Sequence, residues 1–217
     1  MKGLMFDLDG TLVDTLEDIA EACNAMLHTQ GYPTHAIPAY RNFVGRGFTV
    51  LVRRALPSDV QLSPEELEGL VASARLFYST TFLHKSNPYP FIHSSLYDLC
   101  KKGMRLAVLS NKPDQWTKAI VQHFFGDIPF CEVRGALPDV PLKPAPEAAF
   151  AVLRSMGLTP AECLYVGDSD VDMQTAANAG MRSIGVSWGF SSGEEVAAAG
   201  AWRMVTDARQ LLPLAEE

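Results

Sequence analysis

Residues 6–15 of the chain read Phe-Asp-Leu-Asp-Gly-Thr-Leu-Val-Asp-Thr, and the expected fold follows from this stretch. The residues just before Asp7, Gly3 to Phe6, form an apolar run that is typical of a fully buried strand. Two carboxylates one residue apart at the end of such a strand are costly to remove from water. The pattern therefore predicts a cation beside Asp7 and Asp9, although Asp, Gly and Thr also form ordinary turns.

Three further polar motifs accompany this first one. Ser110-Asn111-Lys112 follows the apolar residues 106–109, and the segment 167–172, Gly-Asp-Ser-Asp-Val-Asp, follows the apolar residues 163–166. Between them, Lys143 begins a Lys-Pro-Ala-Pro sequence. Because the carboxyl ends of parallel strands lie at one edge of an open sheet, where ligands bind, we expect these motifs to meet in space.

The four motifs, in this order, resemble those of the haloacid dehalogenase superfamily of aspartate-nucleophile phosphotransferases, and the resemblance covers essentially the whole chain. It implies an α/β fold, a doubly wound parallel sheet with a small helical cap inserted after the first strand. Residues 1–12 and 86–217 would form the catalytic core, and residues 13–85 the cap. The residue pattern agrees, since residues 13–84 are helical in periodicity and helices alternate with buried strands thereafter.

Helix-start signals support this division. Thr15 precedes an acidic first turn and is expected to cap the first helix, while Ser63-Pro64-Glu65-Glu66 has the pattern of a capping box with proline at the first helical position. A short strand is expected at residues 130–133 and an edge strand at 204–205.

The resemblance assigns Asp7 as the nucleophile. A carboxylate fixed at a strand end can attack phosphorus and form an aspartyl-phosphate, which splits hydrolysis into two easier steps. Asp9 could protonate the leaving oxygen and later take a proton from water. The dehalogenase and phosphonate-cleaving branches generally lack an acid at this position, so Asp9 favours phosphate ester chemistry.

The acids also suggest a metal site. Carboxylate ligands without nearby His or Cys suit Mg²⁺. The resemblance implies that the side chains of Asp7 and Asp168 and the backbone carbonyl of Asp9 bind the ion. Asp172 would hold a metal-bound water or Lys143. Asp170 is expected to cap the helix that follows it.

The remaining motif residues are candidates for holding phosphate. The Ser110 hydroxyl and the Asn111 backbone N–H suit phosphoryl oxygens at a helix N-terminus, although Ser110 could also be a helix cap. By its position in the family, Lys143 is the phosphate clamp that offsets the acids; the ordinary interpretation of a single lysine is a surface residue. Lys112 matches a common family residue but has no evident catalytic task.

Three features favour the phosphoglycolate phosphatase-like branch: the Ser110-Asn111-Lys112 motif, Gly45-Arg46-Gly47 in the cap and Trp188-Gly189-Phe190 after the last main strand. Arg46 could bind a substrate carboxylate in a bidentate fork or be a solvated arginine. A sugar phosphomutase of the β-phosphoglucomutase type is the main alternative. A non-catalytic metal-binding regulator is a weaker one.

Composition limits the partners. The net charge of −7 argues against nucleic acid, which needs a basic face, but allows a small phosphorylated substrate. The four cysteines form no Cys-x-x-Cys pair and are expected to be reduced thiols. The first strand leaves no room for a signal peptide, and no apolar run approaches the ~20 residues of a membrane span. We therefore expect a cytoplasmic enzyme whose oligomeric state is open.

Overall fold

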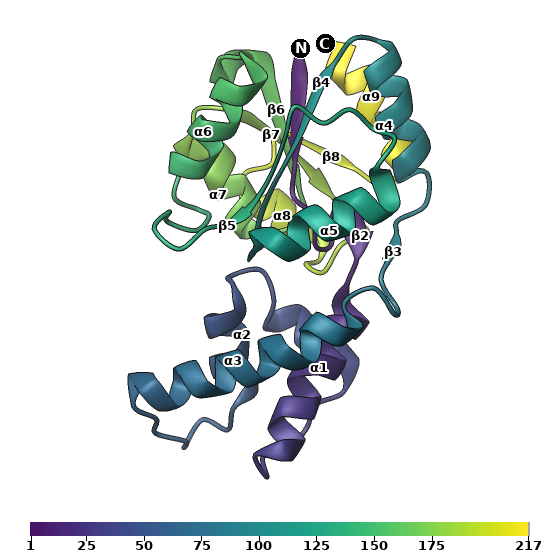
Figure 1. Cartoon of the computed structure of the whole chain (residues 1–217). Coiled ribbons are helices and arrows are strands. Elements are labelled where there is room, and N and C mark those ends of the chain that lie inside the picture. Colours follow the sequence, from purple (N-terminus) through teal and green to yellow (C-terminus); the bar gives the residue numbers. More distant parts are fainter. Residues whose placement is uncertain (217) are drawn as a thin grey trace. The chain divides into compact units, whose positions relative to one another are not determined.

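The computed structural model describes residues 1–216, which form two compact units (Figure 1). One unit contains residues 1–14 and the chain from Pro88 onward, and the other contains residues 15–87. The chain therefore crosses between the units two residues beyond each predicted boundary. That the second unit acts as a cap stays a prediction.

The first unit is built on a six-stranded sheet in the order β5-β4-β1-β6-β7-β8, and each neighbouring pair is parallel. This confirms the doubly wound α/β architecture. The central strand β1 has a neighbour on each side, and its Met5 lies opposite both Ala107 and Tyr165. The strands are β1 (Gly3–Phe6), β4 (Arg105–Pro113), β5 (Glu132–Ala136), β6 (Cys163–Gly167), β7 (Arg182–Val186) and β8 (Arg203–Val205). The expected strand at residues 130–133 thus begins two residues later, at Glu132.

Helices cover both faces of this sheet (Figure 1). Alternate strand residues such as Met5, Leu109 and Tyr165 pack against α6 and α7 in one buried cluster, and α4 and α5 lie on the other face. All nine residues of β1 and β6 are buried and none is charged, as expected for strands that are covered on both faces. The helices of this unit are α4 (Ile92–Lys101), α5 (Asp114–Phe125), α6 (Glu147–Met156), α7 (Asp170–Asn178), α8 (Gly193–Ala198), α9 (Leu211–Glu216) and the 3₁₀ turns η2 (Pro160–Glu162) and η3 (Ala208–Gln210).

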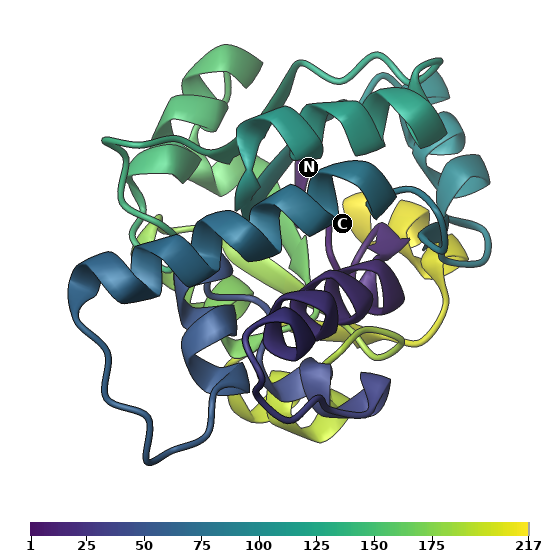
Figure 2. The ribbon, with the colours of Figure 1, turned by 60° about the horizontal axis from the view of Figure 1, so that its bottom comes forward.

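The second unit is helical, with α1 and α3 side by side and α2 against α3 (Figure 2). Ser63 and Glu66 form the predicted capping box, since each side chain accepts the other's backbone N–H, at 3.2 and 2.7 Å. Thr15 occupies the N-cap position of α1 but makes no side-chain capping bond, so that prediction was wrong in its chemistry. The elements are α1 (Leu16–Thr29), η1 (Ile37–Asn42), α2 (Phe48–Ala55) and α3 (Pro64–Thr81).

The chain crossings between the units are extended. Short strands β2 (Val13–Asp14) and β3 (Asn87–Pro88) pair into a two-stranded sheet, so the helical segment begins after residue 13 and not at it. Within the helical unit, the buried Asp18 of α1 accepts hydrogen bonds from the backbone N–H groups of Lys85 and Ser86. Asp18 therefore fastens the last residues of that unit to the first turn of α1. Within residues 1–216, no helix is both long and apolar enough to span a bilayer.

Candidate active site

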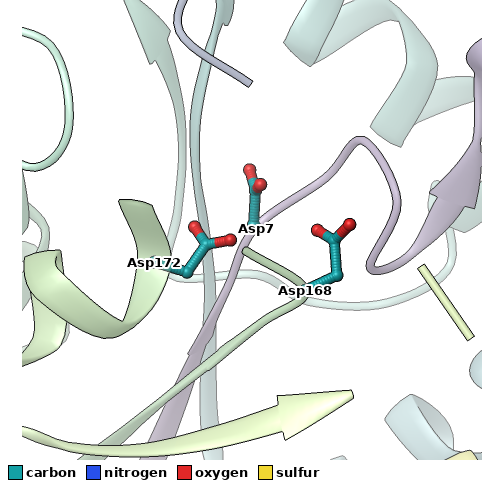
Figure 3. Close-up of side chains that lie close together, drawn as sticks. All are labelled: Asp7, Asp168 and Asp172. Atoms are coloured by element: carbon teal, nitrogen blue, oxygen red, sulfur yellow. The ribbon is translucent and has the colours of Figure 1, made fainter. Parts of the chain in front are cut away.

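Three carboxylates from separate parts of the sequence meet at the carboxyl edge of the sheet (Figure 3). Asp7 directly follows β1, Asp168 directly follows β6, and Asp172 lies in the first turn of α7. One oxygen from each lies within 4.8 Å of the others, and all three residues are buried. The backbone N–H of Asp7 donates to the carbonyl of Val166 at 2.9 Å, so the pairing of β1 with β6 sets the spacing of Asp7 and Asp168.

The two oxygens of Asp7 have different surroundings. Oδ1 accepts the backbone N–H of Leu8 at 2.7 Å and lies 2.9 Å from Nζ of Lys143. Oδ2 accepts no hydrogen bond from the residues that the structure describes. Burial raises the pKa of Asp7 to about 7, against the lowering effect of Lys143, and the charge of Asp172 adds to the rise. The carboxylate is thus held by one oxygen while the other is available to react.

Lys143 is buried among these acids, and its side chain is 2% exposed. Its ammonium lies 2.8 Å from Oδ1 of Asp172 and donates to the Tyr165 hydroxyl at 3.0 Å. Burial by itself lowers the pKa of Lys143, but the charges of Asp172 and Asp7 outweigh that effect and the pKa lies well above its usual range. The interpretation of this residue as a surface lysine is therefore wrong.

Asn111 fixes the backbone that carries this lysine. Its side-chain amide donates to the carbonyl of Lys143 at 3.1 Å, and its side-chain oxygen accepts the Lys143 N–H at 2.8 Å. The predicted phosphate contact of Asn111 uses its backbone N–H and stays a prediction. The side chain has a separate task, which is to connect β4 to the segment that carries Lys143.

Asp168 is enclosed by loops. Its Oδ1 accepts the hydroxyl of Thr11 at 3.0 Å and its Oδ2 accepts the backbone N–H of Phe190 at 2.7 Å. A Cβ atom at Gly10 or Gly189 would overlap the Asp168 side chain, so both glycines allow this close approach. Burial raises the pKa of Asp168 well above its usual range, and the charges of Asp172 and Asp7 add to the rise. The metal-free site therefore disfavours this carboxylate in its charged form.

The contact from Phe190 gives the Trp188-Gly189-Phe190 segment a local role that the sequence did not reveal. The indole N–H of Trp188 donates to the carbonyl of Thr11 at 3.1 Å. The segment thus holds both Asp168 and the turn after Asp9. The sequence signal was present, since an aromatic-glycine-aromatic triplet follows a main strand, but it pointed only to a family branch.

Asp172 has both of its oxygens occupied. Oδ2 accepts the Ser169 hydroxyl at 2.6 Å and the Ser169 N–H at 3.1 Å, while Oδ1 accepts from Lys143. Ser169 and Asp172 form the capping box of α7, so the expectation that Asp170 caps this helix was wrong. These contacts agree with the predicted role of Asp172 in holding Lys143.

The Ser110-Asn111-Lys112 motif lies in an irregular part of β4, where the pairing with β5 shifts register. Pro113 occupies the N-cap position of α5, and the Ser110 hydroxyl instead accepts the Lys112 N–H at 3.3 Å. Ser110 is therefore not the cap of α5. The ammonium of Lys112 lies 2.9 and 3.0 Å from the two carboxylate oxygens of Asp9, a partnership that sequence reasoning missed.

The donor set fits a divalent cation. Asp7, Asp168 and Asp172 bring three carboxylates to one place, and Lys143 is the cation paired with two of them. The excess negative charge in a buried site calls for a further cation. The group contains oxygen donors and neither His nor Cys, a composition that suits a hard ion. The Asp9 carboxylate is not part of this group and instead forms an ion pair with Lys112.

Comparison with known proteins agrees with this geometry. Residues 4–186 match the family described as haloacid dehalogenase-like hydrolase. The chain belongs to this family. This haloacid dehalogenase-like hydrolase is 36% identical over 198 residues to the phosphoglycolate phosphatase of Psychrobacter arcticus. The match covers 89% of this chain and 86% of that one. It is 35% identical over 203 residues to the phosphoglycolate phosphatase of Vibrio vulnificus, covering 91% and 89%.

Solved structures agree as well. A Lactobacillus delbrueckii protein, whose assignment as a phosphoglycolate phosphatase is itself provisional, superimposes with a TM-score of 0.92 at 29% identity. The match covers 99% of this chain and 98% of that one. This haloacid dehalogenase-like hydrolase is thus an enzyme of the phosphoglycolate phosphatase-like kind, and the interpretation as a non-catalytic regulator is set aside.

One predicted site residue of the hydrolase lies in the second, helical unit. Arg46 is half-buried in the loop before α2 of the helical unit. It stands between Gly45 and Gly47, whose φ angles are 100° and 84°, a conformation that favours glycine at both positions. Arg46 stays a predicted substrate contact.

Proposed function

We propose that this hydrolase is a Mg²⁺-dependent phosphatase of small phosphomonoesters, with phosphoglycolate as the favoured class, and that it works through a phosphoryl group carried by Asp7. The observation that carries the proposal is the asymmetry of Asp7. Oδ1 is held by Leu8 and Lys143, whereas Oδ2 accepts no hydrogen bond from the described residues. A nucleophile needs such a fixed carboxylate with one free oxygen.

The Mg²⁺ ion would be held by the side chains of Asp7 and Asp168 and by the backbone carbonyl of Asp9. When bound, it offsets the excess negative charge of the acids and polarises the phosphoryl oxygens. Asp172 has both oxygens engaged by Ser169, Lys143 and Tyr165, which favours a role in holding Lys143 over direct metal binding.

In the first step, Oδ2 of Asp7 attacks phosphorus and the ester P–O bond breaks. The departing alkoxide takes a proton from Asp9 and leaves as an alcohol. Lys143, the Ser110 hydroxyl and the Asn111 backbone N–H hold the phosphoryl oxygens, and the buried ammonium of Lys143 supplies the fixed positive charge that such a transfer needs.

In the second step, Asp9 takes a proton from water as the water oxygen attacks phosphorus. The bond between Asp7 and phosphorus breaks, which releases inorganic phosphate and restores the Asp7 carboxylate. The two steps together return every proton and every oxygen of the enzyme to its starting state.

The substrate class rests on the relatives and on one residue of the helical unit. The relatives from Psychrobacter and Vibrio are named phosphoglycolate phosphatases. Arg46 would bind the substrate carboxylate through two parallel hydrogen bonds, which suits an acid of this kind.

The test is phosphate release from phosphoglycolate with and without Mg²⁺, in the wild type and in Asp7→Asn. The asparagine keeps the shape of the side chain but removes the nucleophile, so we expect release to vanish. Asp170→Asn is the matched control, since Asp170 lies outside the acid cluster and contacts Gln174. Near-wild-type release by Asp7→Asn with its asparagine intact would refute the covalent route. Phosphoryl transfer between positions of a sugar, without phosphate release, would favour the mutase.

A further inference from the structure

Lys112 is a buried cation that the proposed mechanism leaves without a task. Its side chain is 1% exposed and its ammonium lies 2.9 and 3.0 Å from the two oxygens of Asp9, which is 12% exposed. The two residues are 103 positions apart in the sequence; Lys112 lies near the end of β4, and Asp9 lies three residues beyond β1.

We propose that Lys112 is a positioning residue, which holds the Asp9 carboxylate in the orientation that proton transfer to the leaving oxygen requires. The inference rests on the proposed function, because it assumes that Asp9 is the acid. The contacts to both oxygens, at 2.9 and 3.0 Å, hold the end of the carboxylate and so restrict where its oxygens can lie. Proton transfer depends on this alignment within hydrogen-bond reach.

The backbone that carries Lys112 is itself fixed. Its carbonyl accepts the Thr117 hydroxyl of α5 at 3.1 Å, and its N–H donates to the Ser110 hydroxyl at 3.3 Å. On the neighbouring strand, a Cβ atom at Gly135 would lie 2.5 Å from the Lys112 carbonyl oxygen, so β5 packs directly on this backbone. The lysine side chain therefore extends from a rigid base toward Asp9.

Stability alone accounts poorly for this pair. Taking two charges out of water costs much of what their attraction returns, and well-packed apolar residues often replace such a pair without loss. A buried lysine on a proposed catalytic acid is therefore better explained by the chemistry of that acid. Loss of Lys112 should therefore slow the reaction most for substrates whose leaving group needs a proton.

The experiment measures kcat/KM for phosphoglycolate, ethyl phosphate and p-nitrophenyl phosphate in the wild type, Lys112→Met, Asp9→Asn and the double variant. Because kcat/KM includes only the steps up to and including the first irreversible one, it reports departure of the leaving group and not the later attack by water. Both alkyl esters release a basic alkoxide, whereas p-nitrophenolate leaves without a proton.

We expect Lys112→Met to lower kcat/KM for both alkyl esters by about 10–100-fold, the range for loss of a charged hydrogen bond. The loss for p-nitrophenyl phosphate should be several-fold smaller. In the Asp9→Asn background the same lysine substitution should add no further loss specific to alkyl esters, because residues that act as a unit are non-additive. Lys118→Met is the control, since it removes an exposed lysine that pairs with Asp114 within α5.

Equal losses on all three substrates that persist in the Asp9→Asn background would overturn the inference, because Lys112 would then act on the fold alone. A loss confined to phosphoglycolate would also overturn it, since Lys112 would then contact the substrate carboxylate. Lys112→Gln replaces the ammonium with an amide N–H donor. It is measured alongside, so that the result does not depend on Lys112→Met if that variant fails to fold. If Asp9→Asn itself spares ethyl phosphate relative to p-nitrophenyl phosphate, the acid assignment of the proposed function fails, and the inference with it.

Discussion

Removing the charge of Asp7 should stabilise the metal-free protein at alkaline pH while abolishing its activity. Burial raises the pKa of this carboxyl from its ordinary 3.8 to about 7. The folded state therefore binds the proton more tightly than the unfolded state does. Stability is then lost as the pH rises from about 4 to about 7, because over that range the unfolded chain releases the proton and the folded chain keeps it.

The size of the effect follows from the shift. At ~1.4 kcal/mol for each pKa unit, the rise amounts to roughly 4 kcal/mol once the pH exceeds 7. The side chain of Asp7 is only 11% exposed, so solvent screens little of this. Asp7→Asn cannot ionise, yet its oxygen can still accept from Leu8 and Lys143. At pH 8 the variant should therefore be more stable than the wild type by up to about 4 kcal/mol, and about 1 kcal/mol of that gap should develop between pH 6 and pH 8.

The assay is urea unfolding in EDTA at pH 6 and pH 8, followed by tryptophan fluorescence. The isoelectric point near 5.2 makes lower pH unsuitable because the uncharged protein tends to precipitate. Asp170→Asn removes a carboxylate outside the acid cluster and is the matched control. We expect its stability to depend on pH as that of the wild type does. If the wild type and Asp7→Asn show the same pH dependence without metal, the inference that burial raises the pKa of Asp7 is wrong.

Three further predictions concern the metal and the substrate. Asp168→Asn should raise the melting temperature of the metal-free protein and remove the further rise that Mg²⁺ gives the wild type; a Mg²⁺ response that survives would contradict the ligand assignment. Gly189→Ala should weaken Mg²⁺ binding by about 10–100-fold, measured by calorimetry, because its Cβ would displace the Asp168 side chain. Its control, Gly69→Ala in α3, meets nothing within 4 Å and should leave Mg²⁺ binding unchanged while adding about 0.5–1 kcal/mol of stability. Arg46→Ala should lower kcat/KM for phosphoglycolate by about 10–100-fold and spare p-nitrophenyl phosphate; an unchanged ratio would make Arg46 a solvated surface residue.

The parts of the fold that local pattern controls could be predicted from the sequence. Runs of four apolar residues predicted buried parallel strands, and the polar residues that follow them predicted which groups share one edge of the sheet. Ser63 and Glu66 likewise predicted a helix start, because a capping box depends only on residues three apart.

What could not be predicted depends on the direction of side chains in the folded chain. Tyr165 has the pattern of an ordinary strand residue, yet its hydroxyl accepts from Lys143 and donates to the Leu109 carbonyl. The contact of Lys112 with Asp9 joins the end of β4 to the turn after β1, and only the folded sheet determines the relative position of these two segments. Thr15, where the capping bond is absent, shows that residue type alone does not establish such a bond.

The central claim is that a phosphoryl group is carried by Asp7, and the Asp9→Asn variant offers the most direct test. With p-nitrophenyl phosphate this variant should form the phosphorylated enzyme readily, since the leaving group needs no proton, and should hydrolyse it slowly because water is no longer activated. We expect one equivalent of p-nitrophenol to be released ahead of inorganic phosphate. Borohydride reduction of the quenched enzyme should then convert Asp7, located by peptide mass spectrometry, to homoserine. Release of p-nitrophenol and phosphate in step from the first turnover, with Asp7 unmodified, would contradict the covalent mechanism.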